Sequence, residues 1–154
     1  MVAADVPVFV GVGGGLTQGH RVLNLALHAE FQGALGVVVN APTKNETVKM
    51  LHDTIDVPIV VTVLSEDEDI EGRVAAGADI LNISAAGRTP QVVRSIRERF
   101  PDLPIIATGG PTNESIIATI EAGANAITWT PPSNGEVFRD IMEAYRRGEP
   151  HPDF

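Results

Sequence analysis

The sequence predicts an α/β protein built from six alternating strand and helix units around one parallel sheet. Short, near-continuous apolar runs recur along the chain, which is typical of strands buried on both faces. Segments with apolar residues at i, i+3 and i+4 separate these runs and indicate amphipathic helices. The 154 residues suit one domain with a real core. We predict a single domain over residues 1–148 and an irregular tail at 149–154.

The apolar runs carry two repeated signatures. The first has a proline as its second residue and covers residues 6–10, 57–61 and 103–107. The second begins with Gly-Ala and covers residues 33–40, 77–84 and 123–130. The chain therefore resolves into three copies of a unit with two strands and two helices.

Helix-period segments lie between these strands. They cover residues 20–32, 46–54, 67–76, 90–100, 113–122 and 136–146. Capping boxes are expected at 43–46 and 65–68, because a Ser or Thr three residues before a Glu can satisfy free N–H groups of the first turn. Glycines at 33, 77 and 123 are expected to end helices.

A βα repeat forms either a closed barrel or an open doubly wound sheet. A complete eight-unit barrel typically needs at least ~200 residues, and six units are two short. The sequence therefore predicts an incomplete barrel, with an open doubly wound sheet as the alternative. Exposed parallel edges invite pairing, so we expect a homo-oligomer in both cases.

Charge and composition exclude several classes of function. The net charge of −9 argues against nucleic-acid and anionic-membrane partners. The absence of cysteine excludes disulfides, thiolate catalysis and Cys-ligated zinc. No His-x-His cluster is present, so we expect no metal and no cofactor. No signal peptide or apolar run of ~18 residues is recognised, which makes the cytoplasm the expected location.

The segments Leu103-Pro-Ile-Ile-Ala-Thr-Gly-Gly110 and Glu121-Ala-Gly-Ala-Asn-Ala-Ile-Thr128 resemble the last two units of a known family. This is the phosphate-binding (β/α)8-barrel (TIM-barrel) superfamily, which includes thiamine phosphate synthases and phosphogluconate aldolases. Residues 57–84 are similar to the units that precede them. The resemblance covers Val57 to Phe138 and, more loosely, the whole chain. It implies a TIM-like barrel reduced to its last six units.

The resemblance also implies an anion site after the fifth predicted strand. In the family, glycines at this point lend backbone N–H groups to a ligand phosphate, and here they match Gly109 and Gly110. Glycine allows close backbone approach, and the following helix N-terminus adds positive potential. The family's second phosphate turn is replaced by Thr130-Pro-Pro-Ser133, whose prolines have no N–H to donate. Ser133 stays a candidate donor.

A second glycine-rich loop contains Gly13 and Gly14 and follows the first strand. Gly13 lies six residues after Pro7, as Gly110 lies six residues after Pro104. Two interpretations stay open for this loop, contact with an anionic ligand or a tight turn that needs positive φ.

Polar residues recur where strands end, and they supply the remaining site candidates. These are Asn40, Thr62, Asn82, Ser84 and Thr108. Side chains two apart on a strand point to the same face, so these groups are expected to converge at the mouth of the sheet. The alternative is that they cap helices or satisfy one another. His20, beside the first glycine loop, is the best candidate for a general acid or base, although loop histidines are often incidental.

Together these features predict binding of a small phosphorylated or carboxylate metabolite at the C-terminal ends of the strands. Whether the chain is an enzyme stays open at this point. A lyase, an isomerase or a metal-independent hydrolase would suit such a site. The alternatives are a non-catalytic ligand-binding or regulatory protein, or a structural barrel fragment.

Overall fold

The computed structural model describes residues 5–130 and 133–148. The six strands are β1 (Phe9–Gly14), β2 (Gly36–Asn40), β3 (Ile59–Val63), β4 (Ile80–Ile83), β5 (Ile105–Thr108) and β6 (Ala126–Thr128). The helices are α1 (His20–Phe31), α2 (Asn45–His52), α3 (Ile70–Ala75), α4 (Thr89–Arg99), α5 (Asn113–Glu121) and α6 (Asn134–Arg146), with a short 3₁₀ turn, η1 (Ala86–Arg88). The predicted tail at 149–154 and the proline pair at 131–132 lie outside the described residues.

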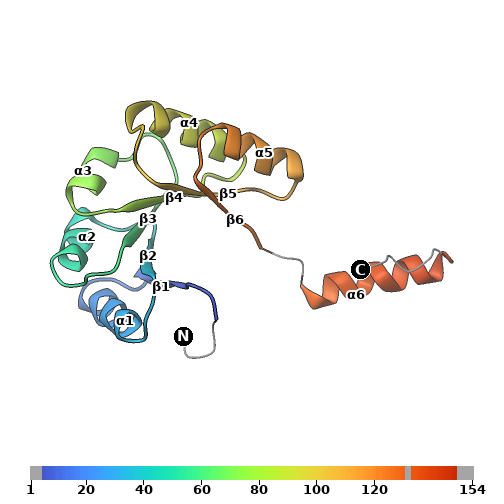
Figure 1. The fold of residues 1–154 in the computed structure, drawn as a ribbon, viewed down its shortest axis with the longest axis horizontal. Helices are drawn as coiled ribbons and strands as arrows, with labels where there is room; N and C mark the ends of the chain where they lie inside the picture. The colour runs from blue at the N-terminus through green and yellow to red at the C-terminus, as the bar shows by residue number, and fades with distance from the viewer. Residues whose placement is uncertain (1–4, 131–132, 149–154) are drawn as a thin grey trace.

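The strands form one parallel sheet in the order β1-β2-β3-β4-β5-β6. Helices α1 to α5 line the outer side of the curved sheet, and they leave its inner side uncovered (Figure 1). A doubly wound sheet would reverse its strand order and carry helices on both faces. The incomplete barrel is therefore confirmed, and the open doubly wound alternative is wrong.

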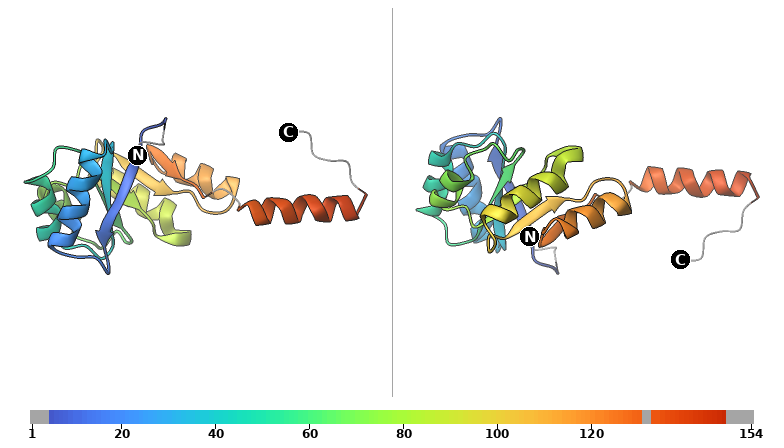
Figure 2. Two further views of the ribbon diagram at one scale, coloured as in Figure 1. Left: turned by 90° about the horizontal axis from the view of Figure 1, so that it is seen from below. Right: turned by 90° about the horizontal axis from the view of Figure 1, so that it is seen from above.

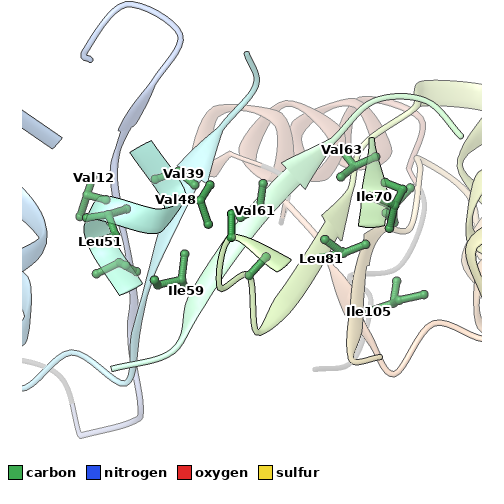
Figure 3. Close-up of a cluster of buried hydrophobic side chains, with 14 of the residues drawn as sticks. Val12, Val39, Val48, Leu51, Ile59, Val61, Val63, Ile70, Leu81 and Ile105 are labelled. Atoms are coloured by element: carbon green, nitrogen blue, oxygen red, sulfur yellow. The ribbon is translucent and has the colours of Figure 1, made fainter. Parts of the chain in front are cut away.

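The core lies between the outer face of the sheet and the helices. Alternate strand residues point into it, so Val61, Leu81 and Ile105 are fully buried within one cluster (Figure 3). All five residues of β3, which lies between β2 and β4, are buried. The intervening residues of each strand point to the inner face, where no helix covers them.

Hydrogen bonds from the second signature explain why it repeats. Asp79 Oδ2 accepts a hydrogen bond from the Ile59 N–H (2.8 Å), and Asn125 Oδ1 accepts one from the Ile105 N–H (2.9 Å). Each acceptor is the third residue of a Gly-Ala signature and binds the first residue of the strand before it. The repeat therefore fixes the register between successive strands. The first copy has Leu35 here, which has no side-chain acceptor.

Two of the predicted helix starts are wrong. Lys44 caps α2 without a side-chain hydrogen bond, because the Thr43 hydroxyl donates to the Asn40 carbonyl instead. In the second case α3 begins at Ile70, and its cap is Asp69, whose side chain accepts from the Gly72 N–H. Capping boxes occur instead at the starts of α5 and α6.

The predicted helix ends are confirmed. Gly33, Gly77 and Gly123 have φ values of 78°, 103° and 108°, and each follows the C-cap residue of its helix, α1, α3 or α5. The first strand differs from its prediction of residues 6–10, because β1 runs from Phe9 to Gly14. A bulge between Gly11 and Gly13 shifts its register against β2 and lets the strand run into the glycine loop.

Helix α6 extends away from the sheet and from the other helices (Figure 2). In the described ranges, no helix combines the length and apolar character needed to cross a membrane.

Candidate functional site

The inner face of the sheet carries a row of hydrogen-bonded polar side chains. Asn82 Nδ2 donates to Thr62 Oγ1 (3.2 Å), and Thr62 Oγ1 donates to Asn40 Oδ1 (3.5 Å). Further along, Thr108 Oγ1 donates to Ser84 Oγ (3.3 Å). The structure therefore brings the five predicted strand-end residues to one face, and these hydrogen bonds show that they partly satisfy one another, as the alternative interpretation expected. We call these five side chains the polar row.

One acceptor in the polar row is unsatisfied. Asn82 Oδ1 is buried and has no hydrogen-bond partner among the described residues. Buried polar atoms nearly always have a partner, which is either protein or ordered water. This oxygen therefore has capacity for a hydrogen bond from a ligand or a water molecule. The neighbouring Thr62 is buried as well, which restricts the movement of the row.

A cavity of about 590 Å³ opens at the C-terminal ends of β5 and β6. It is lined by Thr108, Gly110, Pro111, Thr128, Trp129 and Thr130. Its volume falls within the ~300–1,000 Å³ typical of small-molecule sites. We call it the β5–β6 cavity. Thr108 belongs both to this cavity and to the polar row, so the two features adjoin.

A second cavity of about 260 Å³ lies between the loops that follow β4 and β5. It shares Thr108, Gly110 and Pro111 with the β5–β6 cavity, so both open on the same strand ends. Its wall includes Ala86, which has φ 52° although it is not glycine. Backbone strain of this kind tends to occur at ligand sites. No residue pattern in the sequence marks this strain.

The two glycines that the resemblance assigned to a phosphate differ in what they offer. The Gly109 N–H donates to the Thr128 carbonyl (3.3 Å), so the sheet uses it. A Cβ at Gly109 would lie 2.6 Å from Ile127 Cγ2, which explains glycine there by packing. Gly110 has φ 78° and lines both cavities, and its N–H has no hydrogen-bond partner within the described residues.

Backbone N–H groups of the first glycine loop donate hydrogen bonds to carbonyls of the protein itself. The Gly14 N–H donates to the Thr17 carbonyl (2.9 Å), and the Gly15 N–H donates to the Pro42 carbonyl (3.0 Å). The hollow beside Gly14 holds only about 20 Å³, which is about one water molecule. These contacts favour a tight turn for Gly13 and Gly14 over contact with a ligand.

His20 and Ser133 lie apart from the strand-end cavities. His20 is exposed at the start of α1 and lines neither cavity. Ser133 caps α6: its Oγ accepts from the Glu136 N–H (3.3 Å), and the Glu136 carboxylate accepts from Ser133. These hydrogen bonds from the Ser133 side chain and backbone hold the pKa of Glu136 below its usual range. Ser133 therefore acts in the helix cap.

Ionisable groups are scarce at the site. The described lining residues of both cavities are neutral at any ordinary pH. The charged residues adjacent in the chain to lining residues are Glu114, beside Ser115, and Arg88, after β4. Arg88 pairs with Glu66, after β3, with Glu66 Oε2 3.6 Å from Arg88 Nη1. Sequence reasoning missed this pair because its members lie far apart in the chain, although both follow neighbouring strands. Over the described ranges, no His, Asp and Glu cluster suits a metal ion.

Six parallel strands in chain order, with helices α1 to α5 on the outer side of the curved sheet, define an incomplete TIM barrel. Solved structures agree with this assignment. A protein from Burkholderia cenocepacia with a provisional assignment as a phosphonomutase matches at TM-score 0.69 and 18% identity, covering 96% of this chain and 71% of that one. Inosine 5′-monophosphate dehydrogenase from Legionella pneumophila matches at TM-score 0.65 and 21% identity, covering 80% and 43%.

Sequence relatives point in the same direction. Inosine-5′-monophosphate dehydrogenase from Halalkalibacterium halodurans is 32% identical over 130 residues, which cover 73% of this chain and 25% of that protein. The chain spans only 13% to 25% of the length of the curated relatives it matches. No protein-family model matches the chain.

Proposed function

We propose that this chain binds a small phosphorylated or carboxylate metabolite at the C-terminal ends of β4, β5 and β6. The β5–β6 cavity carries the proposal, because it has the volume of a small-ligand site and opens where TIM-type barrels hold their ligands. The adjoining polar row adds hydrogen-bonding groups along the inner face.

The anionic part of the ligand fits against Gly110. Its N–H lines the cavity without a described partner and can donate to an anion. Thr108 and Thr128 line the same space, and their hydroxyls, which donate to Ser84 Oγ (3.3 Å) and the Ala107 carbonyl (3.4 Å), would turn toward a bound ligand. The N-terminus of α5 follows directly and contributes positive potential, which Glu114 in its first turn partly offsets. Neutral donors of this kind suit a phosphate or carboxylate.

The rest of the ligand fits toward the polar row. Asn82 Oδ1 can accept a hydrogen bond, so a ligand with hydroxyl or amide donors suits this face better than a bare anion. The names of the relatives also support a phosphorylated compound, since the dehydrogenases act on a nucleoside 5′-monophosphate.

Binding without catalysis is the form of this proposal that the site supports best. General acid–base chemistry needs an ionisable group within hydrogen-bond reach of the reacting atoms, and neither cavity has one among its described lining residues. Activity as a lyase, isomerase or metal-independent hydrolase is the second candidate. It rests on the enzymes among the relatives and would need a group such as His20 to reach the ligand.

The single tryptophan gives a direct assay, because Trp129 lines the β5–β6 cavity. The protein would be titrated with inorganic phosphate, sugar and triose phosphates and small carboxylates, with sulfate for comparison, while its fluorescence is recorded. A saturable change with one class of compound is expected. Thermal shift provides the second readout: a ligand at ~100 times its dissociation constant adds about 2.7 kcal/mol, or roughly 5–11 °C.

Matched variants separate the site from the surface. Thr108→Val keeps the side-chain shape but removes the hydroxyl, so it should weaken binding. Thr54→Val, at an exposed position in the turn after α2, should not. Turnover of a bound compound that His20→Ala abolishes would favour the enzyme, whereas binding without turnover of any compound in the panel would favour the non-catalytic form. The absence of any fluorescence or thermal response across the whole panel would refute the proposal.

A further inference from the structure

Helix α6 presents an apolar stripe to solvent. Phe138, Ile141, Met142 and Tyr145 follow i, i+3 and i+4 spacing, so they lie on one side of the helix. Phe138 is 65% exposed and Tyr145 is 77% exposed. The helix stands away from the rest of the domain, and none of the described elements covers this stripe (Figures 1 and 2). Clustered exposed apolar side chains of this size mark interaction surfaces.

Helix α5 has a complementary flank. Ile117 is 53% exposed and Ile120 is 52% exposed, and they lie one turn apart. Ser115 and Thr119, on the other side of the helix, line the cavity toward α4. The two isoleucines therefore face away from α4, toward the place that the next helix of a βα repeat would occupy.

The charges beside the two apolar surfaces also match. Glu114 and Glu121 border the isoleucine flank of α5, and Arg139 and Arg146 border the apolar stripe of α6. Both pairs are seven residues apart, a rise of ~10.5 Å. Helices of successive βα units run in the same direction, so the two rows can lie side by side with opposite charges facing.

Helix α6 could pack against the isoleucine flank of α5 in its own chain or in a second copy of the chain. In the structure α6 extends away from its own α5 (Figure 2). Thr130, the last described residue before 131–132, precedes a proline in the sequence, and a residue in that position favours the extended conformation over the α conformation. This preference agrees with the direction in which α6 extends.

We propose that α6 packs on the α5 flank of a second copy of this chain, and that two copies exchange this helix reciprocally. The exchange buries both apolar stripes and closes with two-fold symmetry, so it forms a dimer and leaves no free copy of either surface. The residues of this interface line neither of the two strand-end cavities.

The chain has no cysteine, so one engineered pair can report which copy α6 contacts. The variant Ile117→Cys/Phe138→Cys would be oxidised and run on a non-reducing gel, with each single variant as control. Exchange predicts a covalent dimer from the double variant only. A cross-linked monomer would show that α6 folds onto its own chain, and the absence of any cross-link would show that the two surfaces do not meet. Either of these results overturns the proposal.

Light scattering on the unmodified chain gives an independent measurement. The expected mass is twice the chain's 16.3 kDa. Arg139→Glu/Arg146→Glu should raise the dimer dissociation constant about tenfold, and adding Glu114→Arg/Glu121→Arg should restore it to within about threefold. Phe31→Asp, on the exposed end of α1, should leave the dimer unchanged. A monomer at every concentration, or a dimer insensitive to the reversed charges, contradicts the exchange.

Discussion

Replacing Arg97 with methionine should destabilise the protein far more than its position near the surface suggests. The guanidinium of Arg97 joins three segments: the end of α4, the loop after it and the turn between α5 and β6. Its Nη1 donates to the carbonyls of Pro101 (2.7 Å) and Leu103 (2.8 Å). Its Nη2 donates to the Gly123 carbonyl (2.9 Å) and to Asn125 Oδ1 (2.7 Å).

The expected loss is about 3 kcal/mol. A hydrogen bond from a charged group contributes roughly 1.5–3 kcal/mol, and water can replace the partners that are exposed. We count only the contacts to Gly123 and Leu103, which are partly buried, at the lower value. At roughly 2–4 °C for each kcal/mol in a domain of this size, the melting temperature should fall by roughly 6–12 °C.

Calorimetry or circular dichroism would measure the change, with Arg99→Met as the matched control. Arg99 lies on the same helix, but it forms an exposed ion pair with Glu71 (2.6 Å) and lies over the ring of the adjacent Phe100 (5.5 Å to the centroid), so it joins no loop to another element by its hydrogen bonds. Exposed pairs contribute little, so this control should shift the melting temperature by less than ~3 °C. Equal shifts in melting temperature for the two variants would refute the reasoning, because Arg97 would then stabilise the fold no more than an exposed surface charge does.

Two further predictions concern a glycine with positive φ and the pH dependence of an ion pair. Gly14→Ala should lower the free energy of unfolding, measured by urea denaturation, by more than ~1 kcal/mol. Gly14 has φ 87°, and the new Cβ would lie 1.9 Å from the Asn40 carbonyl oxygen. The control variant Gly135→Ala in α6 should not lower it. The hydrogen bond from Arg99 holds the pKa of Glu71 below its usual range, so this pair should stabilise the fold above about pH 4.5 and stop doing so as the pH falls through the lowered pKa. A wild-type and Arg99→Met stability difference that persists at pH 3 would contradict that assignment.

The architecture was predictable because its signals are local and repeated. Apolar runs buried on both faces, helix-period segments and three Gly-Ala helix ends recur at similar spacing, and each copy reinforces the others. The polar row was predictable for the same reason, since side chains at equivalent repeat positions point to one face of a parallel sheet. Asn82 and Thr62 are opposite each other in the register.

Other features depend on which of two possible hydrogen bonds a group forms, and sequence patterns do not show which one forms. The Thr43 hydroxyl could cap a helix or bind the Asn40 carbonyl, and the structure has the second. The Gly109 N–H could donate to a ligand or to the Thr128 carbonyl, and in the structure it donates to Thr128. Likewise, the positive φ of Ala86 and the pairing of Glu66 with Arg88 arise from tertiary contacts.

The sequential strand order also determines where the molecule opens first. Each strand pairs only with strands adjacent in the chain, so local unfolding can begin at either edge and proceed inward unit by unit. Amide hydrogens of β3 should exchange most slowly and those of the two edge strands faster. The edge strand β6 should exchange fastest, because it has only three residues and none of them is buried. The β5–β6 cavity lies at this labile edge, so a ligand bound there would slow exchange chiefly in the last unit of the sheet.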